Sequence, residues 1–123
     1  MSLIVESYYR KTKSGASLDV EEKPKAPFNN MFGPEDWRKT VWGSGILKEL
    51  NCVLLSSLST QDIYAEDEQI QQLKKELKIA KKNISQITGH LAIKQESFQF
   101  RLDNAFEAIR IAEKQKNGGV YIG

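Results

Sequence analysis

The chain has 123 residues, of which 40% are hydrophobic and 28% are charged, and its 18 basic and 16 acidic side chains give a formal net charge of +2. This composition is typical of one globular domain over residues 1–123 and excludes disordered and fibrous classes. No apolar run approaches the roughly 20 residues that span a bilayer, so we expect no membrane association. The small net charge argues against nucleic-acid binding, which usually needs a strongly basic patch.

The N-terminal quarter contains one predicted strand and a long loop. Residues 3–9 are rich in β-branched and aromatic side chains, which favours a strand. Glu6 ends the first apolar run after three residues and no basic start precedes it, so we expect no signal peptide and a cytoplasmic location. From about residue 10 to 33 no periodic pattern persists, and this loop either has a function, contains a short hairpin around residues 14–15 or is mobile.

Two short elements are predicted between residues 34 and 55. Pro34 favours the first position of a helix, and the two acidic residues after it suit the positive end of a helix dipole. The Gly-Ser-Gly segment at residues 43–45 is expected to break or bend this helix. Residues 52–55 form a continuously apolar run, which is typical of a central strand with both faces covered.

Apolar residues recur at spacings of three and four in two later segments, which predicts two helices. The first stripe spans residues 70–87 and the second residues 98–112. Only about nine residues separate them, so we expect the helices to fold back on each other as a hairpin. Gly89 is placed to end the first helix, whereas the second begins at Ser97 or earlier and ends near residues 117–119.

The final residues complete the predicted fold. Residues 120–122 favour a strand at the edge or in the centre of the sheet. The last helix contains Phe106 and Ala108 outside its stripe, so we expect it to contact both its partner helix and the sheet. The predicted fold class is therefore α+β, with a small sheet of about three strands packed against an antiparallel helical hairpin, in the order β-α-β-α-α-β.

Residues with catalytic or metal-binding chemistry occur singly. His90, the only histidine, has no predicted partner, and a surface position explains it. Cys52, the only cysteine, excludes an internal disulfide and a cysteine-based zinc site, and lies in an apolar run where cysteine usually behaves as a small hydrophobe. Residues 43–45 lack the Lys-Ser/Thr pair of a phosphate-binding loop. We expect no enzyme activity, no cofactor and no metal.

An aromatic cluster and an acidic segment remain as candidate sites. The aromatic cluster either lines a pocket or forms a satellite core that fixes the long loop; its members are Phe28, Met31, Phe32, Trp37 and Trp42. The acidic segment has four carboxylates around one tyrosine and no basic residue. Its members, the candidate partner-binding residues, are Asp62, Tyr64, Glu66, Asp67 and Glu68. Such a segment can bind a basic protein surface by imitating phosphates, but helix-dipole compensation explains three of the carboxylates equally well.

A set of aromatic, glycine and polar positions forms a pattern over the chain after about residue 30. The set comprises Trp37, Trp42-Gly43-Ser44, Leu54-Leu55, Asp62-Ile63-Tyr64, Arg101-Leu102-Asp103-Asn104 with Ala108-Ile109, and Gly118-Gly119-Val120-Tyr121-Ile122. Together these residues resemble small uncharacterised bacterial proteins, some of which are similar to immunity proteins of contact-dependent and polymorphic toxin systems. The resemblance implies a cytoplasmic protein that binds and neutralises a toxin domain by occluding it, without catalysis of its own.

The kind of toxin and the oligomeric state of the protein stay open. Immunity proteins against basic nucleases are often acidic, whereas this chain is slightly basic, which argues against a nuclease as the toxin. The second interpretation is a structural or regulatory homo-oligomer without catalytic activity, in which leftover apolar surface on the helix pair joins two copies as a homodimer.

Overall fold

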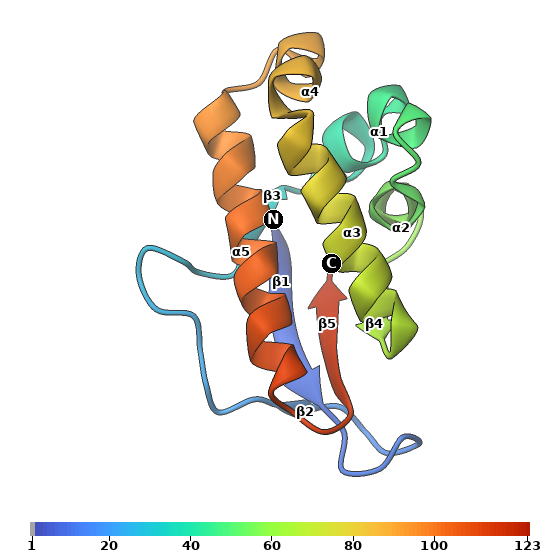
Figure 1. Ribbon diagram of the computed structural model, residues 1–123, viewed down its shortest axis with the longest axis vertical. Helices are drawn as coiled ribbons and strands as arrows, with labels where there is room; N and C mark the ends of the chain where they lie inside the picture. Colours follow the sequence, from blue (N-terminus) through green and yellow to red (C-terminus); the bar gives the residue numbers. More distant parts are fainter. Residues whose placement is uncertain (1) are drawn as a thin grey trace.

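The structure, a computed structural model, describes residues 2–123 as an α+β fold in which helices pack on one antiparallel sheet (Figure 1). The elements in chain order are β1 Ser2–Tyr9, β2 Leu18–Asp19, β3 Met31–Pro34, the π-helical turn η1 Arg38–Trp42, α1 Gly45–Glu49, α2 Val53–Ser56, the 3₁₀ turn η2 Ser57–Ser59, β4 Ile63–Glu66, α3 Glu68–Lys82, α4 Ile84–Leu91, α5 Gln95–Glu113 and β5 Gly118–Ile122. The predicted α+β class is therefore confirmed.

The sheet brings the two ends of the chain together at its centre. β1 and β5 are neighbours, β4 lies on the other side of β5, and both β2 and β3 pair with the remaining side of β1. The register places Tyr121 between Glu6 and Tyr64, so these three side chains form one row across three strands. The sheet has five strands rather than the predicted three, because β2, β3 and β4 have four residues or fewer and are too short to show an alternating pattern.

The helices α3 and α5 form the predicted antiparallel hairpin and lie in front of β1 and β5 in the view of Figure 1. α5 packs on α3 and on the two central strands, as its wide apolar stripe predicts. Leu77 on α3 and Ile109 on α5 are both buried in the core between these layers. The hairpin therefore supplies most of the apolar cover for one face of the sheet.

The first helical stripe forms two helices rather than one. α3 ends at Asn83, whose side-chain amide donates to the Ile79 carbonyl at 2.8 Å, and α4 continues from Ile84. Gly89 lies inside α4, so the predicted helix end at this residue is wrong. Ala92 ends α4 instead, in the left-handed conformation at φ 55°. An exposed glycine inside a helix costs only about 1 kcal/mol, which packing of the neighbouring turns can offset.

The predicted helix start at Pro34 is also wrong. Pro34 ends β3, where it lies opposite Ser2, and helical structure begins only at Arg38. The reason is that residues 31–34 complete the outer edge of β1, a pairing over a long sequence distance that local signals do not show. The expected break at residues 43–45 is confirmed, since η1 ends before this segment and α1 begins at its last residue.

The apolar run at residues 52–55 forms the start of α2 rather than a central strand. The backbone amides of Leu54 and Leu55 donate to the carboxylate of Glu76, a fully buried residue of α3, at 3.0 Å and 2.9 Å. This carboxylate pairs with backbone N–H groups that have no partner within the helix, at the start of a helix that is too short to be stable alone. Apolar periodicity cannot separate a buried four-residue helix from a buried strand, which explains the wrong prediction.

The loop at residues 10–33 contains a short hairpin and is fastened to α5. Tyr8 and Tyr9 of β1 pair with β2, which confirms the hairpin interpretation for its first half. Further along, the fully buried Asn104 accepts a hydrogen bond from the Asn29 amide at 2.9 Å and donates to the Met31 carbonyl at 2.8 Å. These bonds hold the second half of the loop against the middle of α5.

The centre of the aromatic cluster packs into the core and does not line a pocket. Trp42 is fully buried, with its ring stacked 4.2 Å from Phe32 and 5.3 Å from Phe98. Its indole N–H donates to the Phe32 carbonyl at 3.1 Å. Trp37 contacts the same ring edge-on at 6.2 Å. Phe32, Trp37 and Trp42 thus join η1 and β3 to α5 as part of the main core, whereas Met31 is exposed and Phe28 lines a surface hollow, so the satellite-core interpretation holds only for part of the cluster.

Candidate functional site

The face of the sheet opposite α3 and α5 displays tyrosines among carboxylates. Side chains alternate between the two faces of a strand, so Leu3 and Val5 point into the core while their neighbours point the other way. We call the second set, together with the carboxylate at each rim, the open face; its members are Glu6, Tyr8, Asp19, Asp62, Tyr64, Glu66 and Tyr121. Four strands and the turn before β4 therefore contribute to one surface.

The tyrosine rings form a contiguous aromatic strip. The centroids of Tyr64 and Tyr121 are 5.0 Å apart, and Tyr8 contacts Tyr64 edge-on at 6.4 Å. Gly119 makes room for this strip, because a Cβ at that position would lie 2.4 Å from the Tyr8 ring. Tyr8 is consequently only 6% exposed, whereas Tyr64 is 55% exposed. The strip thus has a buried base and one ring that is free to contact another molecule.

One end of the open face is fixed by Glu66. Its carboxylate accepts hydrogen bonds from the Tyr8 hydroxyl and from Arg10 Nε, the second at 3.0 Å. Burial acts to raise the pKa of Glu66, but the bonds from Arg10 and Tyr8 outweigh it, so the pKa of this carboxyl lies below its usual range. Burial and the bond to Glu66 raise the pKa of the Tyr8 phenol. Glu66 is therefore charged and Tyr8 neutral at physiological pH.

The other end is fixed by Asp62. It accepts hydrogen bonds from the Tyr121 hydroxyl at 2.9 Å and from Arg38 Nη2 at 3.0 Å. Burial, followed by the bond to Asp62, raises the pKa of Tyr121 to about 12. Arg38 also donates to Glu35 at 2.9 Å and to the Leu58 carbonyl at 3.0 Å, which ties η1 to the turn before β4. Two of the three rings are thus held by carboxylates.

Two carboxylates of the open face are left for other molecules. Glu6 and Asp19 make no ion pair with residues 2–123, and Glu6 accepts a hydrogen bond from the Asn30 side-chain amide at 3.4 Å. With Glu66 and Asp62 each compensated by one arginine, these two give the surface an excess of negative charge. They also line a shallow hollow of about 200 Å³ beside Tyr64 and Tyr121.

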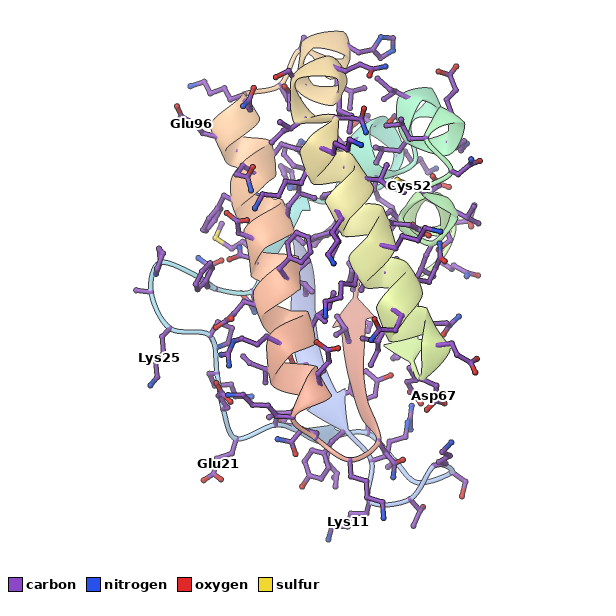
Figure 2. All side chains as sticks on the ribbon, in the orientation of Figure 1. Lys11, Glu21, Lys25, Cys52, Asp67 and Glu96 are labelled. Atoms are coloured by element: carbon purple, nitrogen blue, oxygen red, sulfur yellow. The ribbon has the colours of Figure 1, made fainter. Side chains whose placement is uncertain are left out.

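The predicted partner-binding residues are divided by the structure. Asp62, Tyr64 and Glu66 share the open face, because they occupy alternate positions in and just before β4. Asp67 and Glu68 do not lie on this face. They lie where α3 begins, as the label of Asp67 in Figure 2 shows, and the carboxylate of Asp67 is 3.8 Å from Lys13 Nζ. These two fit the helix-dipole explanation better.

Sequence reasoning missed Glu6, Tyr8, Asp19 and Tyr121 as members of the same surface. The alternation in the predicted first strand could have placed Glu6 and Tyr8 on one face. No local signal places Tyr121 beside Tyr64, because that contact depends on the register of β5 with β4. The aromatic strip is therefore a product of long-range pairing.

The residues with catalytic chemistry lie apart from the open face and from one another. Cys52 is buried between α2 and α3 (Figure 2), and burial followed by the charge of Glu76 raises the pKa of its thiol to about 11. His90 is exposed on α4. Within residues 2–123 no three His, Cys, Asp or Glu side chains are grouped to hold a metal ion, and none of the helices there has the length and apolar character needed to cross a membrane.

Cys52 is expected to be unreactive in the folded protein. At pH 8 its thiol is protonated and shielded, so Ellman's reagent should modify it only as fast as the chain unfolds. The measurement is the absorbance of released thionitrobenzoate with and without urea. Complete modification of the folded chain at the rate of free cysteine would contradict the position given to this residue.

Comparisons with protein-family models, with curated proteins and with solved structures found no match for this chain. The resemblance to immunity proteins therefore stays a prediction.

Proposed function

We propose that this protein is a non-enzymatic protein-binding module whose open face binds a basic surface on a partner protein. The observation that supports this most is the tyrosine strip, bounded by carboxylates, on a sheet face opposite the helical layer. Tyrosine is enriched at protein interfaces because it offers a large apolar ring and a polar hydroxyl at low entropic cost. Tyr64 is the ring that a partner would cover.

The rigidity of the open face favours binding. Tyr8 and Tyr121 are already held by Glu66 and Asp62, so they lose little conformational freedom when a partner arrives. Only Tyr64 and the two uncompensated carboxylates must become ordered. A surface that is organised before association keeps more of the interaction free energy for binding.

The charges select a basic partner. A lysine or arginine over the Tyr64 ring would gain a cation–π contact, and its neighbours could pair with Glu6 and Asp19. We infer that binding occludes the functional surface of this partner by steric and electrostatic contact, as an immunity protein neutralises a toxin domain. A second copy of the chain and a nucleic acid fit this surface less well, because the first repeats its acidic groups and the second is itself an anion.

The test is a calorimetric titration with the product of the neighbouring gene. Tyr64→Ala and Glu6→Lys change exposed side chains, so the fold should persist, and each should weaken binding by about 30-fold or more, which corresponds to about 2 kcal/mol. Glu68→Ala is the matched control: it removes a carboxylate that lies outside the open face and should leave the dissociation constant unchanged.

The titration also separates the alternatives. Higher salt should weaken binding if charge complementarity contributes. Equal affinity for the wild type, Tyr64→Ala and Glu6→Lys would rule out the open face. A homo-oligomer would instead show a mass above that of one chain in light scattering, in the absence of any partner.

A further inference from the structure

The tyrosine strip already holds one cation that belongs to the chain itself. The guanidinium carbon of Arg10 lies 5.4 Å from the centroid of the Tyr8 ring, within the distance at which an aromatic face attracts a cation. Arg10 Nη2 also lies 2.9 Å from the Glu66 carboxylate, to which the Tyr8 hydroxyl donates. A tyrosine, a carboxylate and a cation therefore form one unit at this end of the open face. The other end repeats the three groups as Tyr121, Asp62 and Arg38.

The hollow of about 200 Å³ beside Tyr64 has tyrosines and carboxylates but lacks the cation of such a unit. Its lining comes from four strands and from the loop before β2, and consists of Glu6, Ser7, Tyr8, Ser17, Asp19, Tyr64 and Tyr121. None of these residues is a lysine or an arginine, and the two carboxylates among them make no ion pair with residues 2–123. A cation that enters the hollow therefore meets two uncompensated negative charges.

The register of β1 and β2 brings these two carboxylates close together. Tyr8 lies directly opposite Asp19, and Glu6 is two residues before Tyr8 on the same face of β1. Diagonal neighbours of this kind lie roughly 7–8 Å apart. One small cation between the two side chains can therefore contact both carboxylates.

The size and shape of the hollow fit one compact cation. Its volume of about 200 Å³ is below the roughly 300–1,000 Å³ of pockets that enclose a whole small molecule. The ring planes of Tyr64 and Tyr121 are inclined at 54°, and those of Tyr8 and Tyr64 at 69°. A planar guanidinium can stack on only one ring of such a set. A compact ammonium group can approach several rings, and its three N–H donors suit two carboxylates.

We propose that this hollow binds the ammonium group of one lysine of the partner protein, an inference that rests on the proposed function. The lysine supplies next to Tyr64 the cation that the chain itself supplies at the two ends of the open face. Its aliphatic stem passes the Tyr64 ring, and its ammonium group lies between Glu6 and Asp19. The partner therefore needs one lysine that projects beyond the rest of its basic surface.

The probes are three capped tripeptides, Gly-Lys-Gly, Gly-Arg-Gly and Gly-norleucine-Gly, titrated at low ionic strength into the nitrogen-15-labelled full chain. Norleucine keeps the four-carbon stem of lysine and removes the charge. The lysine peptide should shift the backbone amide signals of Glu6, Asp19 and Tyr64 to saturation. The arginine peptide should bind about fivefold more weakly, and the norleucine peptide should not reach saturation.

Two variants of the chain locate the ammonium group. Asp19→Asn removes one of the two charges and keeps the size of the side chain, so it should weaken the lysine peptide about tenfold. Glu68→Gln is the matched control, because it makes the same change of charge where α3 begins, outside the open face. It should leave the affinity of the lysine peptide unchanged.

The outcomes separate the lysine site from the proposed function. Saturation by the norleucine peptide at the same signals, or arginine binding as tight as lysine binding, would overturn the assignment to an ammonium group. No saturation by the lysine peptide, or equal affinity for the wild type and Asp19→Asn, would overturn the lysine site and leave the proposed function to the calorimetric titration of Tyr64→Ala. Lysine binding together with equal affinity of the wild type and Tyr64→Ala for the gene product would count against the proposed function alone.

Discussion

Replacing Trp42 with alanine is expected to lower the free energy of unfolding by about 4 kcal/mol. The indole is fully buried between Phe32 and Phe98, and its N–H satisfies the Phe32 carbonyl. The substitution leaves a cavity where η1, β3 and α5 meet and removes the partner of a buried carbonyl. The measurement is urea unfolding of both proteins, followed by far-ultraviolet circular dichroism.

The control for this substitution is Trp42→Phe. Phenylalanine keeps an aromatic ring in the stack but removes the N–H donor, so we expect a loss of about 2 kcal/mol, intermediate between the wild type and the alanine variant. A loss below about 1 kcal/mol for Trp42→Ala would show that the aromatic cluster does not hold the N-terminal half to α5.

Glu76→Ala is expected to lower the free energy of unfolding by about 3 kcal/mol. The Glu76 carboxylate is fully buried and accepts hydrogen bonds from the backbone amides of Leu54 and Leu55 and from Gln72 Nε2, the last at 2.6 Å. Alanine leaves two amides at the start of α2 without a partner in a place that water reaches poorly. Urea unfolding measures the loss of unfolding free energy. Faster hydrogen exchange of the α2 amides would locate this loss at α2.

Two comparisons isolate the role of the Glu76 carboxylate. Glu76→Gln keeps one acceptor oxygen and the side-chain volume, so it should cost about 1 kcal/mol. Glu68→Ala removes an exposed carboxylate from the same helix and should change stability by less than about 0.5 kcal/mol. Equal losses for Glu76→Ala and Glu68→Ala would mean that α2 does not depend on this contact.

The long helices could be predicted from the sequence because their apolar spacing extends over several turns. The stripe at residues 98–112 gives both the existence of α5 and its contacts with α3 and the sheet. The break at Asn83 could not be predicted, since the apolar spacing continues across it into α4. Periodicity reports which face is buried and does not report whether the helix axis is continuous.

The short elements depended on contacts far away in the sequence. The apolar residues 52–55 form a helix because Glu76 accepts their amides, and Pro34 ends a strand because β1 lies beside it. Neither partner is visible in a local window of sequence. The sequence prediction therefore missed the short strands β2, β3 and β4 and counted one false strand at residues 52–55.

The candidate site was predicted in part, and for a different reason from the one that the structure gives. The acidic composition singled out Asp62, Tyr64 and Glu66, which share one face because they alternate along β4. The structure adds the partners of that face: Tyr121 bonds to the first of these carboxylates and Tyr8 to the second. A charge pattern can therefore locate one strand of a site, whereas the complete surface requires the register of the sheet.

The most direct test of the open face as the binding surface is a nuclear magnetic resonance titration of the nitrogen-15-labelled chain with the neighbouring gene product. Backbone amide signals of Glu6, Tyr64, Glu66 and Tyr121 should shift or broaden, while signals from the solvent-exposed side of α3, such as that of Lys75, should stay in place. Perturbations confined to α3 and α5, with unchanged signals from β4 and β5, would contradict the account.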